Sequence, residues 1–220
     1  MSLLLNLFAA RRVRSPRQVD SKSWEDREKI LESDVNLFCW KRPVDPLISA
    51  FLIDHLESFS KPISFNVTPE TLIEKIECAK KEWGTHEGST AELFWQDVNR
   101  LVGDFMKLSQ AASATFHLKV VTNNACTKFH VDGYSQRLFT TYVGKGTEWL
   151  DEETSNRKAL GSTNESIVKD PSRIRRMESF EVGILKGEVP NKQSETRGIV
   201  HKSPDIEQSG EKRIILRVDI

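Results

Sequence analysis

The sequence has no excess charge of either sign and no long hydrophobic run. Its 32 Lys and Arg residues balance 32 Asp and Glu residues, so no overall positive potential attracts nucleic acid or an anionic membrane. No apolar run approaches the roughly 20 residues that a helix needs to cross a bilayer. We therefore expect no nucleic-acid partner and no membrane span.

Cysteine is also scarce, with only Cys39, Cys78 and Cys126 in the chain. An odd number at wide spacing is a poor disulfide framework in a protein of this length, and it favours a reducing compartment. The apolar residues 1–10 have no basic residues before them, which argues against a secretory signal. We expect a cytoplasmic protein.

Helix signals dominate residues 36–113. Asp45 with Pro46 has the form of an N-cap followed by a first-turn proline, and Thr68 with Pro69 repeats it. Ser89 has the form of the N-cap of a third helix, with Glu92 completing a capping box. Apolar residues recur on one stripe after each start. We predict helical support over 36–113 and a flexible or peripheral segment over 1–35.

From about residue 114 the pattern changes to short runs rich in β-branched and aromatic residues. Helices followed by strands favour one α+β domain over residues 1–220, with a β core over 114–220 and the helices outside it. The polar segment 151–176 predicts a long loop insertion that covers the mouth of the core. The runs predict strands over 115–121, 128–132, 138–143, 180–185, 198–201 and 213–218.

Two histidines and one carboxylate are the clearest candidates for chemistry. His130 and Asp132 lie two positions apart in a predicted strand, which places both side chains on one face, where they can bind one metal ion. His201, in a later predicted strand, supplies a third ligand. Such a triad leaves coordination positions open, as in non-haem Fe(II) oxygenases. The alternative is an edge strand with a solvated polar face.

The final predicted strand carries two candidate anion-binding residues. Arg213, Ile215 and Arg217 share one face, opposite an apolar face that begins at Ile214. An arginine directed into a barrel must meet an anion. In Fe(II) oxygenases that use 2-oxoglutarate as a cosubstrate, this ketoacid chelates the iron through one end, and the carboxylate at its far end needs a cation. Arg213 is the first choice and Arg217 the alternative, although either residue can instead form a surface ion pair.

Two further residues are candidates for the same site. Tyr142 is a candidate to bond a cosubstrate carboxylate from inside the barrel, or is a core tyrosine with a satisfied hydroxyl. Cys126 lies four positions before His130, and a thiolate there would shift the metal preference from Fe(II) toward Zn. The alternative for Cys126 is a packing role at the start of a strand.

The order His130-x-Asp132, His201 and Arg213 resembles that of the Fe(II)/2-oxoglutarate dioxygenase superfamily. This resemblance implies a double-stranded β-helix, the jelly-roll or cupin-like barrel, with helices outside it and with Fe(II) and 2-oxoglutarate as cofactors. A second resemblance, to the domain of unknown function family numbered 1826, implies no activity. It rests on segments 36–43, 126–132, 137–150, 182–188 and 200–204.

The leading hypothesis is a hydroxylase-type oxygenase that depends on Fe(II) and 2-oxoglutarate, with an unknown substrate. Its catalytic metal ligands are His130, Asp132 and His201. The alternative is a cupin-like protein that binds zinc or iron for metal handling and has no oxygenase activity. A third hypothesis is a structural or interaction protein in which the triad is accidental.

Overall fold

The computed structural model describes residues 15–59, 61–84, 88–124, 126–190 and 196–220. The first part of the predicted N-terminal segment, residues 1–14, lies outside the described residues. The strands of the large sheet are, from edge to edge, β1 (Arg17–Ser21), β2 (Val35–Trp40), β8 (Val182–Lys186), β5 (Gln136–Val143), β10 (Arg213–Asp219), β4 (Ala114–Val121) and β3 (Ile63–Val67). A small sheet contains β7 (Arg175–Arg176), β6 (Glu148–Leu150) and β9 (Val200–Lys202).

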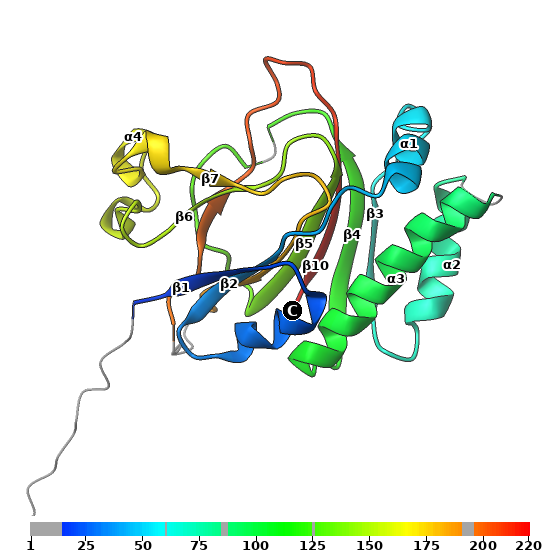
Figure 1. Cartoon of the computed structure of the whole chain (residues 1–220), viewed down its shortest axis with the longest axis horizontal. Helices are drawn as coiled ribbons and strands as arrows, with labels where there is room; N and C mark the ends of the chain where they lie inside the picture. Colours follow the sequence, from blue (N-terminus) through cyan, green and yellow to red (C-terminus); the bar gives the residue numbers. More distant parts are fainter. Residues whose placement is uncertain (1–14, 60, 85–87, 125, 191–195) are drawn as a thin grey trace, which may run out of the picture.

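Three helices, α1 (Pro46–Asp54), α2 (Leu72–Glu82) and α3 (Ser89–Ser109), cover one face of the large sheet (Figure 1). Asp45 caps α1 as predicted, because its side chain accepts hydrogen bonds from the backbone N–H groups of Leu47 and Ile48. The other two starts differ from the prediction. Thr71, not Thr68, is the N-cap of α2, and Gly88 is the N-cap of α3, which begins at Ser89 without a side-chain cap.

The large sheet separates a hydrophobic core from a polar pocket. Ile214, Leu216 and Val218 of β10 are buried in the core with the helices, whereas Arg213 and Arg217 line the pocket on the opposite face. The predicted division of this strand into two faces is therefore confirmed. It follows from the two-residue period of side chains along a strand.

The helical region contains strands that the sequence patterns did not reveal. Strands β2 and β3 lie within residues 36–113 or overlap its start, and they pair with β8 and β4. Residues 15–35 are also part of the fold, since β1 pairs with β2 in parallel and both Trp24 and Ile30 are buried. The division into a peripheral segment, a helical support and a β core is thus too simple.

The predicted strand over residues 128–132 does not form. Only His130 takes part in a β-bridge, with His201, and the rest of this segment is irregular. The predicted jelly-roll barrel is not confirmed either, because the described strands form two separate sheets and no closed barrel. The coarser prediction of a mixed α+β protein with helices on one face of a sheet is confirmed.

Residues 151–176 are less loop-like than predicted. They contain two short 3-10 turns, helix α4 (Asn164–Ile167) and strand β7, and Figure 1 shows this segment on the side of the sheet away from α1 to α3. Ile167 of α4 packs with Phe129, Leu150 and Val200 in a small hydrophobic cluster. Among the described residues, no helix has the length and apolar character needed to cross a bilayer.

Candidate metal centre and its pocket

His130, Asp132 and His201 converge between the two sheets. One ligand atom from each lies within 4.8 Å of the other two. His130 Nε2 is 3.5 Å from Asp132 Oδ1, and His201 Nε2 is 3.4 Å from Asp132 Oδ2. The two imidazoles therefore flank one carboxylate, a donor set of two nitrogens and one oxygen that suits a divalent transition metal.

Backbone contacts orient both imidazole rings. His130 Nδ1 lies 2.9 Å from the carbonyl oxygen of Lys128, and His201 Nδ1 lies 3.2 Å from that of Ile199. A hydrogen bond donated by Nδ1 to a carbonyl fixes the tautomer in which Nε2 is a free electron-pair donor, as metal-bound histidines require. The orientation of both rings thus fits a metal on the Asp132 side.

The pKa values of the three side chains differ because their surroundings differ. Contact with Asp132 raises the pKa of His130 against the effect of burial. Burial lowers the pKa of His201 to about 4, more than the nearby Asp132 raises it. Burial also opposes ionisation of Asp132, yet contacts with His130, His201 and Arg137 lower its pKa to about 2. At neutral pH the centre therefore has an ionised carboxylate and a neutral His201, the states that bind metal.

Arg137 supports the carboxylate from the protein side. Its Nη1 lies 2.6 Å from Asp132 Oδ2, and its Nε donates to Asp219 Oδ1 at 2.5 Å. Asp132 Oδ2 is nevertheless buried without a contact of hydrogen-bond geometry. A carboxylate oxygen has lone pairs for more than one partner, so Asp132 can bind a metal ion while Arg137 contacts it.

The positions of the ligands depend on the main chain around them. The backbone of His130 pairs with that of His201 through two hydrogen bonds of 3.0 and 2.9 Å. Glu188 N donates to Asp132 O at 2.8 Å, and a side chain at Gly187 would collide with the carbonyl oxygens of Asp132 and Tyr134. His130 and Asp132 are therefore aligned by close backbone packing and not by the predicted strand.

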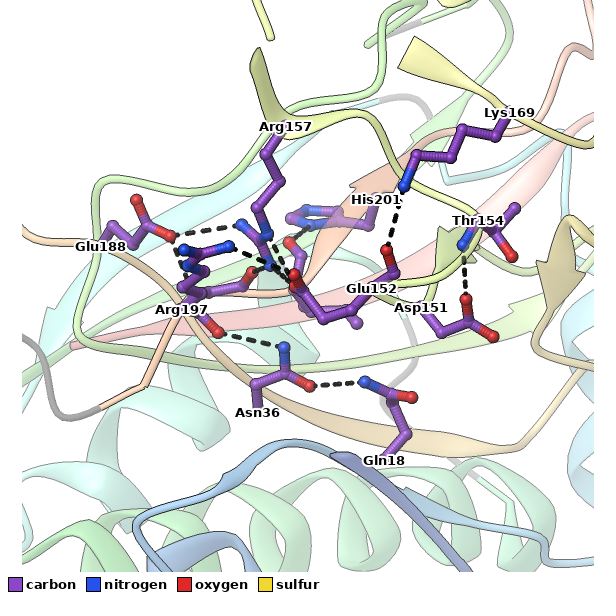
Figure 2. A network of polar contacts seen from close by, with 12 residues as sticks. Gln18, Asn36, Asp151, Glu152, Thr154, Arg157, Lys169, Glu188, Arg197 and His201 are labelled. Carbon is purple, nitrogen blue, oxygen red and sulfur yellow. Dashed lines mark hydrogen bonds and ion pairs between the residues drawn. The ribbon is translucent and has the colours of Figure 1, made fainter. Parts of the chain in front are cut away.

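A polar network attaches the 151–176 segment to the strand that carries His201. Arg157 Nε donates to Glu152 at 2.6 Å, and Arg157 Nη2 donates to the carbonyl oxygen of Gly198 at 2.5 Å. Glu188 accepts from Gly198 N at 2.9 Å and lies 3.3 Å from Arg157 Nη1. Figure 2 shows Arg157 at the centre of this network, with His201 in the same view. The sequence patterns did not predict this network around Arg157, which we call the Arg157 clamp.

A cavity of about 150 Å³ lies beside the two histidines of the triad. His130 and His201 line it together with Phe139, Ile215 and the cationic residues described below. One water molecule needs about 10–15 Å³ of such space, so the cavity is large enough for a small organic molecule.

Arg213 lines this cavity without a carboxylate partner. It is 2% exposed, its Nη2 donates only to Thr141 Oγ1 at 3.2 Å, and its Nε has no hydrogen bond. Burial lowers its pKa to about 10, although Glu148 acts in the opposite direction. No carboxylate of the described residues lies within ion-pair distance. A buried guanidinium in this state is a strong binding site for an anion.

The remaining predicted residues divide between pocket and core. Arg217 lines the pocket, but its Nε lies 3.1 Å from Asp219 Oδ2, so it already has an anionic neighbour. Cys126 also lines the pocket and is exposed, outside the cluster of metal-ligand atoms. Tyr142 lies on the opposite face of the sheet, fully buried against Phe94, and donates to Asp97 Oδ2 at 2.7 Å. A cosubstrate role for Tyr142 is therefore wrong, and its reading as a core tyrosine is correct.

These features define an α+β protein with a candidate metal centre between its two sheets. The chain belongs to the family described as Protein of unknown function (DUF1826), whose family model matches residues 21–219. This confirms the resemblance to that family. No curated protein sequence matches the chain.

Solved structures of dioxygenases have a similar fold. Dioxygenase for auxin oxidation 1 from Arabidopsis thaliana, in a binary complex with 2-oxoglutarate, has a TM-score of 0.51 at 8% identity, covering 94% of this chain and 92% of that chain. The dioxygenase for auxin oxidation from rice has a TM-score of 0.51 at 9% identity, covering 94% of this chain and 82% of that chain. At such low identity the similarity concerns the fold alone.

Proposed function

We propose that this protein is an Fe(II)- and 2-oxoglutarate-dependent oxygenase of the hydroxylase type. One observation carries the proposal, namely that both histidines of the two-histidine, one-carboxylate cluster line the same cavity as the buried Arg213, which has no carboxylate partner among the described residues. The fold similarity to two dioxygenases supports it. We further propose that the two sheets correspond to the two halves of a double-stranded β-helix.

Each residue has a defined role in this proposal. His130, Asp132 and His201 would hold the iron, and Arg213 would bind the far carboxylate of 2-oxoglutarate through its guanidinium. Iron with bound 2-oxoglutarate supplies the oxidising chemistry that uses O2 to hydroxylate a substrate. Arg137 keeps Asp132 ionised and oriented, and Phe139 and Ile215 provide apolar walls that limit the access of water.

Binding of 2-oxoglutarate to the Mn(II)-loaded protein, measured by isothermal titration calorimetry, tests the proposal. Wild type should bind one Mn(II) and one 2-oxoglutarate. Arg213→Met should lower the 2-oxoglutarate affinity by about 30-fold or more, since loss of one partner of a buried charge pair costs about 2–5 kcal/mol. Arg217→Met is the matched control on the same strand and should retain the affinity. Asp132→Ala should lose Mn(II), while the exposed Asp54→Ala should not.

An Asp132→Ala protein with full metal content and full turnover of 2-oxoglutarate in the presence of Fe(II) would contradict the proposal. The zinc-binding alternative rests on Cys126, which lines the pocket. One equivalent of zinc in the purified protein, retained in the presence of excess Fe(II), together with no 2-oxoglutarate binding, would favour that alternative. Loss of this zinc in Cys126→Ser would identify the thiolate as a ligand.

A further inference from the structure

The pocket carries more positive charge than an iron and 2-oxoglutarate site requires. Lys119, Arg137, Arg213 and Arg217 all line it. Arg137 and Arg217 each have a carboxylate within ion-pair distance, whereas Arg213 is assigned to the far carboxylate of 2-oxoglutarate. Of the four cationic residues, Lys119 alone has not been assigned an anionic partner. Its backbone pairs with β10, but its side chain has no hydrogen bond and no ion pair within the described part of the chain.

Lys119 lies beside the two arginines of β10. Its register partner on that strand is Ile215, so Arg213 and Arg217 occupy the two diagonal positions on the same face. Side chains at diagonal positions are about 7–8 Å apart, within reach of long residues. Three cationic side chains therefore border one patch of the pocket wall.

This arrangement costs free energy when no ligand is bound. Burial lowers the pKa of Lys119, and the charges of Arg217, Arg213 and Arg137 lower it further, more than Cys126 raises it. Like charges placed close together on a sheet are destabilising. An anion between them would remove this repulsion. The neighbouring wall is apolar, because Ile215 and Phe139 line the same pocket.

We infer that Lys119, with Arg217 beside it, forms a second anion site in the pocket, and that the substrate is a carboxylic acid with an apolar body. The substrate assignment rests on the proposed function, whereas the anion site rests on Lys119 and its neighbours alone. The carboxylate would accept hydrogen bonds from Lys119 Nζ, and the apolar body would pack on Ile215 and Phe139. The apolar wall beside the ammonium group favours such an acid over a free phosphate.

Benzoate and its neutral analogue benzamide are the probes for this site. Their affinities for the full-length protein loaded with Mn(II) and 2-oxoglutarate are measured by ligand-observed NMR. Benzoate should bind at least about 10-fold more tightly than benzamide, which corresponds to about 1.4 kcal/mol. Lys119→Met should lower the benzoate affinity by about 10-fold and change the 2-oxoglutarate affinity by less than about 3-fold. Lys145→Met, an ion-paired lysine outside the pocket lining, is the control and should alter neither.

Three results would overturn the inference. Equal affinities of benzoate and benzamide in wild type would exclude the anion site. A loss of 2-oxoglutarate affinity in Lys119→Met as large as that in Arg213→Met would assign Lys119 to the cosubstrate. Tighter binding of inorganic phosphate than of benzoate would refute the substrate class. If wild type binds no 2-oxoglutarate, the proposed function fails, while the comparison of benzoate with benzamide on the Mn(II) protein still tests the anion site.

Discussion

Arg213 is buried and Arg42 is partly buried, but only Arg42 has its charge compensated by a described carboxylate. Arg42 forms a bidentate pair with Asp97 at 2.7 and 2.9 Å and donates to the carbonyl oxygen of Phe180. Arg213 has only the Thr141 hydroxyl as a hydrogen-bond acceptor among the residues that the structure describes. A buried charge without a counterion lowers stability, so the protein without ligand retains Arg213 at a cost. Such a cost is expected of a binding residue rather than of a structural one.

We therefore predict that Arg213→Met leaves the free energy of unfolding of the ligand-free protein unchanged or raises it by about 1–3 kcal/mol. Arg42→Met should lower it by about 3–5 kcal/mol, because it leaves Asp97 buried without its bidentate partner. Urea denaturation of the two variants and wild type in EDTA measures both values. An equal destabilisation in the two variants would show that Arg213 has a structural role.

Individual residues show what strand alternation can and cannot predict. The sequence correctly separates Arg213 and Arg217 from the apolar face of β10, because the two-residue period is a property of the backbone. It does not say which face of β5 turns toward the pocket. Tyr142 was a candidate for either the pocket or the core, and its hydroxyl bonds to Asp97 of α3 in the core. Only the packing of helices on the sheet decides that choice.

At the scale of elements, the ligand segment at 130–132 is the instructive case. The composition of residues 128–132 predicted a strand, in which His130 and Asp132 would share one face, but the segment has one β-bridge. His130 and Asp132 nevertheless converge, because close packing of Gly187 fixes the backbone there. The helices were easier to predict, since a cap such as Asp45 acts locally. Strands β2 and β3 were missed, because they pair with β8 and β4 through long-range contacts that local sequence patterns do not encode.

The Arg157 clamp leads to a prediction about how the 151–176 segment supports metal binding. Arg157 joins the 151–176 segment to Gly198, which precedes β9 and His201. Residues that orient metal ligands typically change metal affinity by about 10–100-fold when replaced. Because Arg157 acts through the backbone, we expect Arg157→Met to lower Mn(II) affinity by about 10-fold. Calorimetric titration with Mn(II) measures it.

Arg173→Met is the matched control for this experiment. Arg173 lies in the same segment and pairs with Asp151 and Glu153, and its side chain is about half exposed; among the described residues, the side chain that donates to the Gly198 carbonyl is that of Arg157. Arg173→Met should retain the Mn(II) affinity of wild type. An Arg157→Met protein with unchanged affinity would mean that β9 holds His201 in place without help from the 151–176 segment.

The whole molecule is arranged in layers that follow from residue chemistry. Helices bury the apolar face of the large sheet, and the other face, with the small sheet, encloses charged residues that the sequence alone had suggested as ligands. The sequence could single out His130, Asp132 and His201 as candidate metal ligands, because residue type and strand alternation are local properties. That neither Arg213 nor Lys119 has a carboxylate of the described residues within ion-pair distance could not be predicted, because this depends on which carboxylates lie nearby in three dimensions.

Burial of His201 predicts how the stability of the whole metal-free molecule depends on pH. Its folded pKa of about 4 lies below the unfolded value of 6.5, so the unfolded chain binds more protons between these pH values and stability falls as pH falls. From this residue alone, wild type in EDTA should lose about 2 kcal/mol between pH 7 and pH 5. His130 acts in the opposite direction, since its pKa is raised. Urea denaturation of wild type and His201→Asn at both pH values isolates His201, and equal pH dependence would mean that this imidazole accepts a proton in the folded protein as readily as in the unfolded chain.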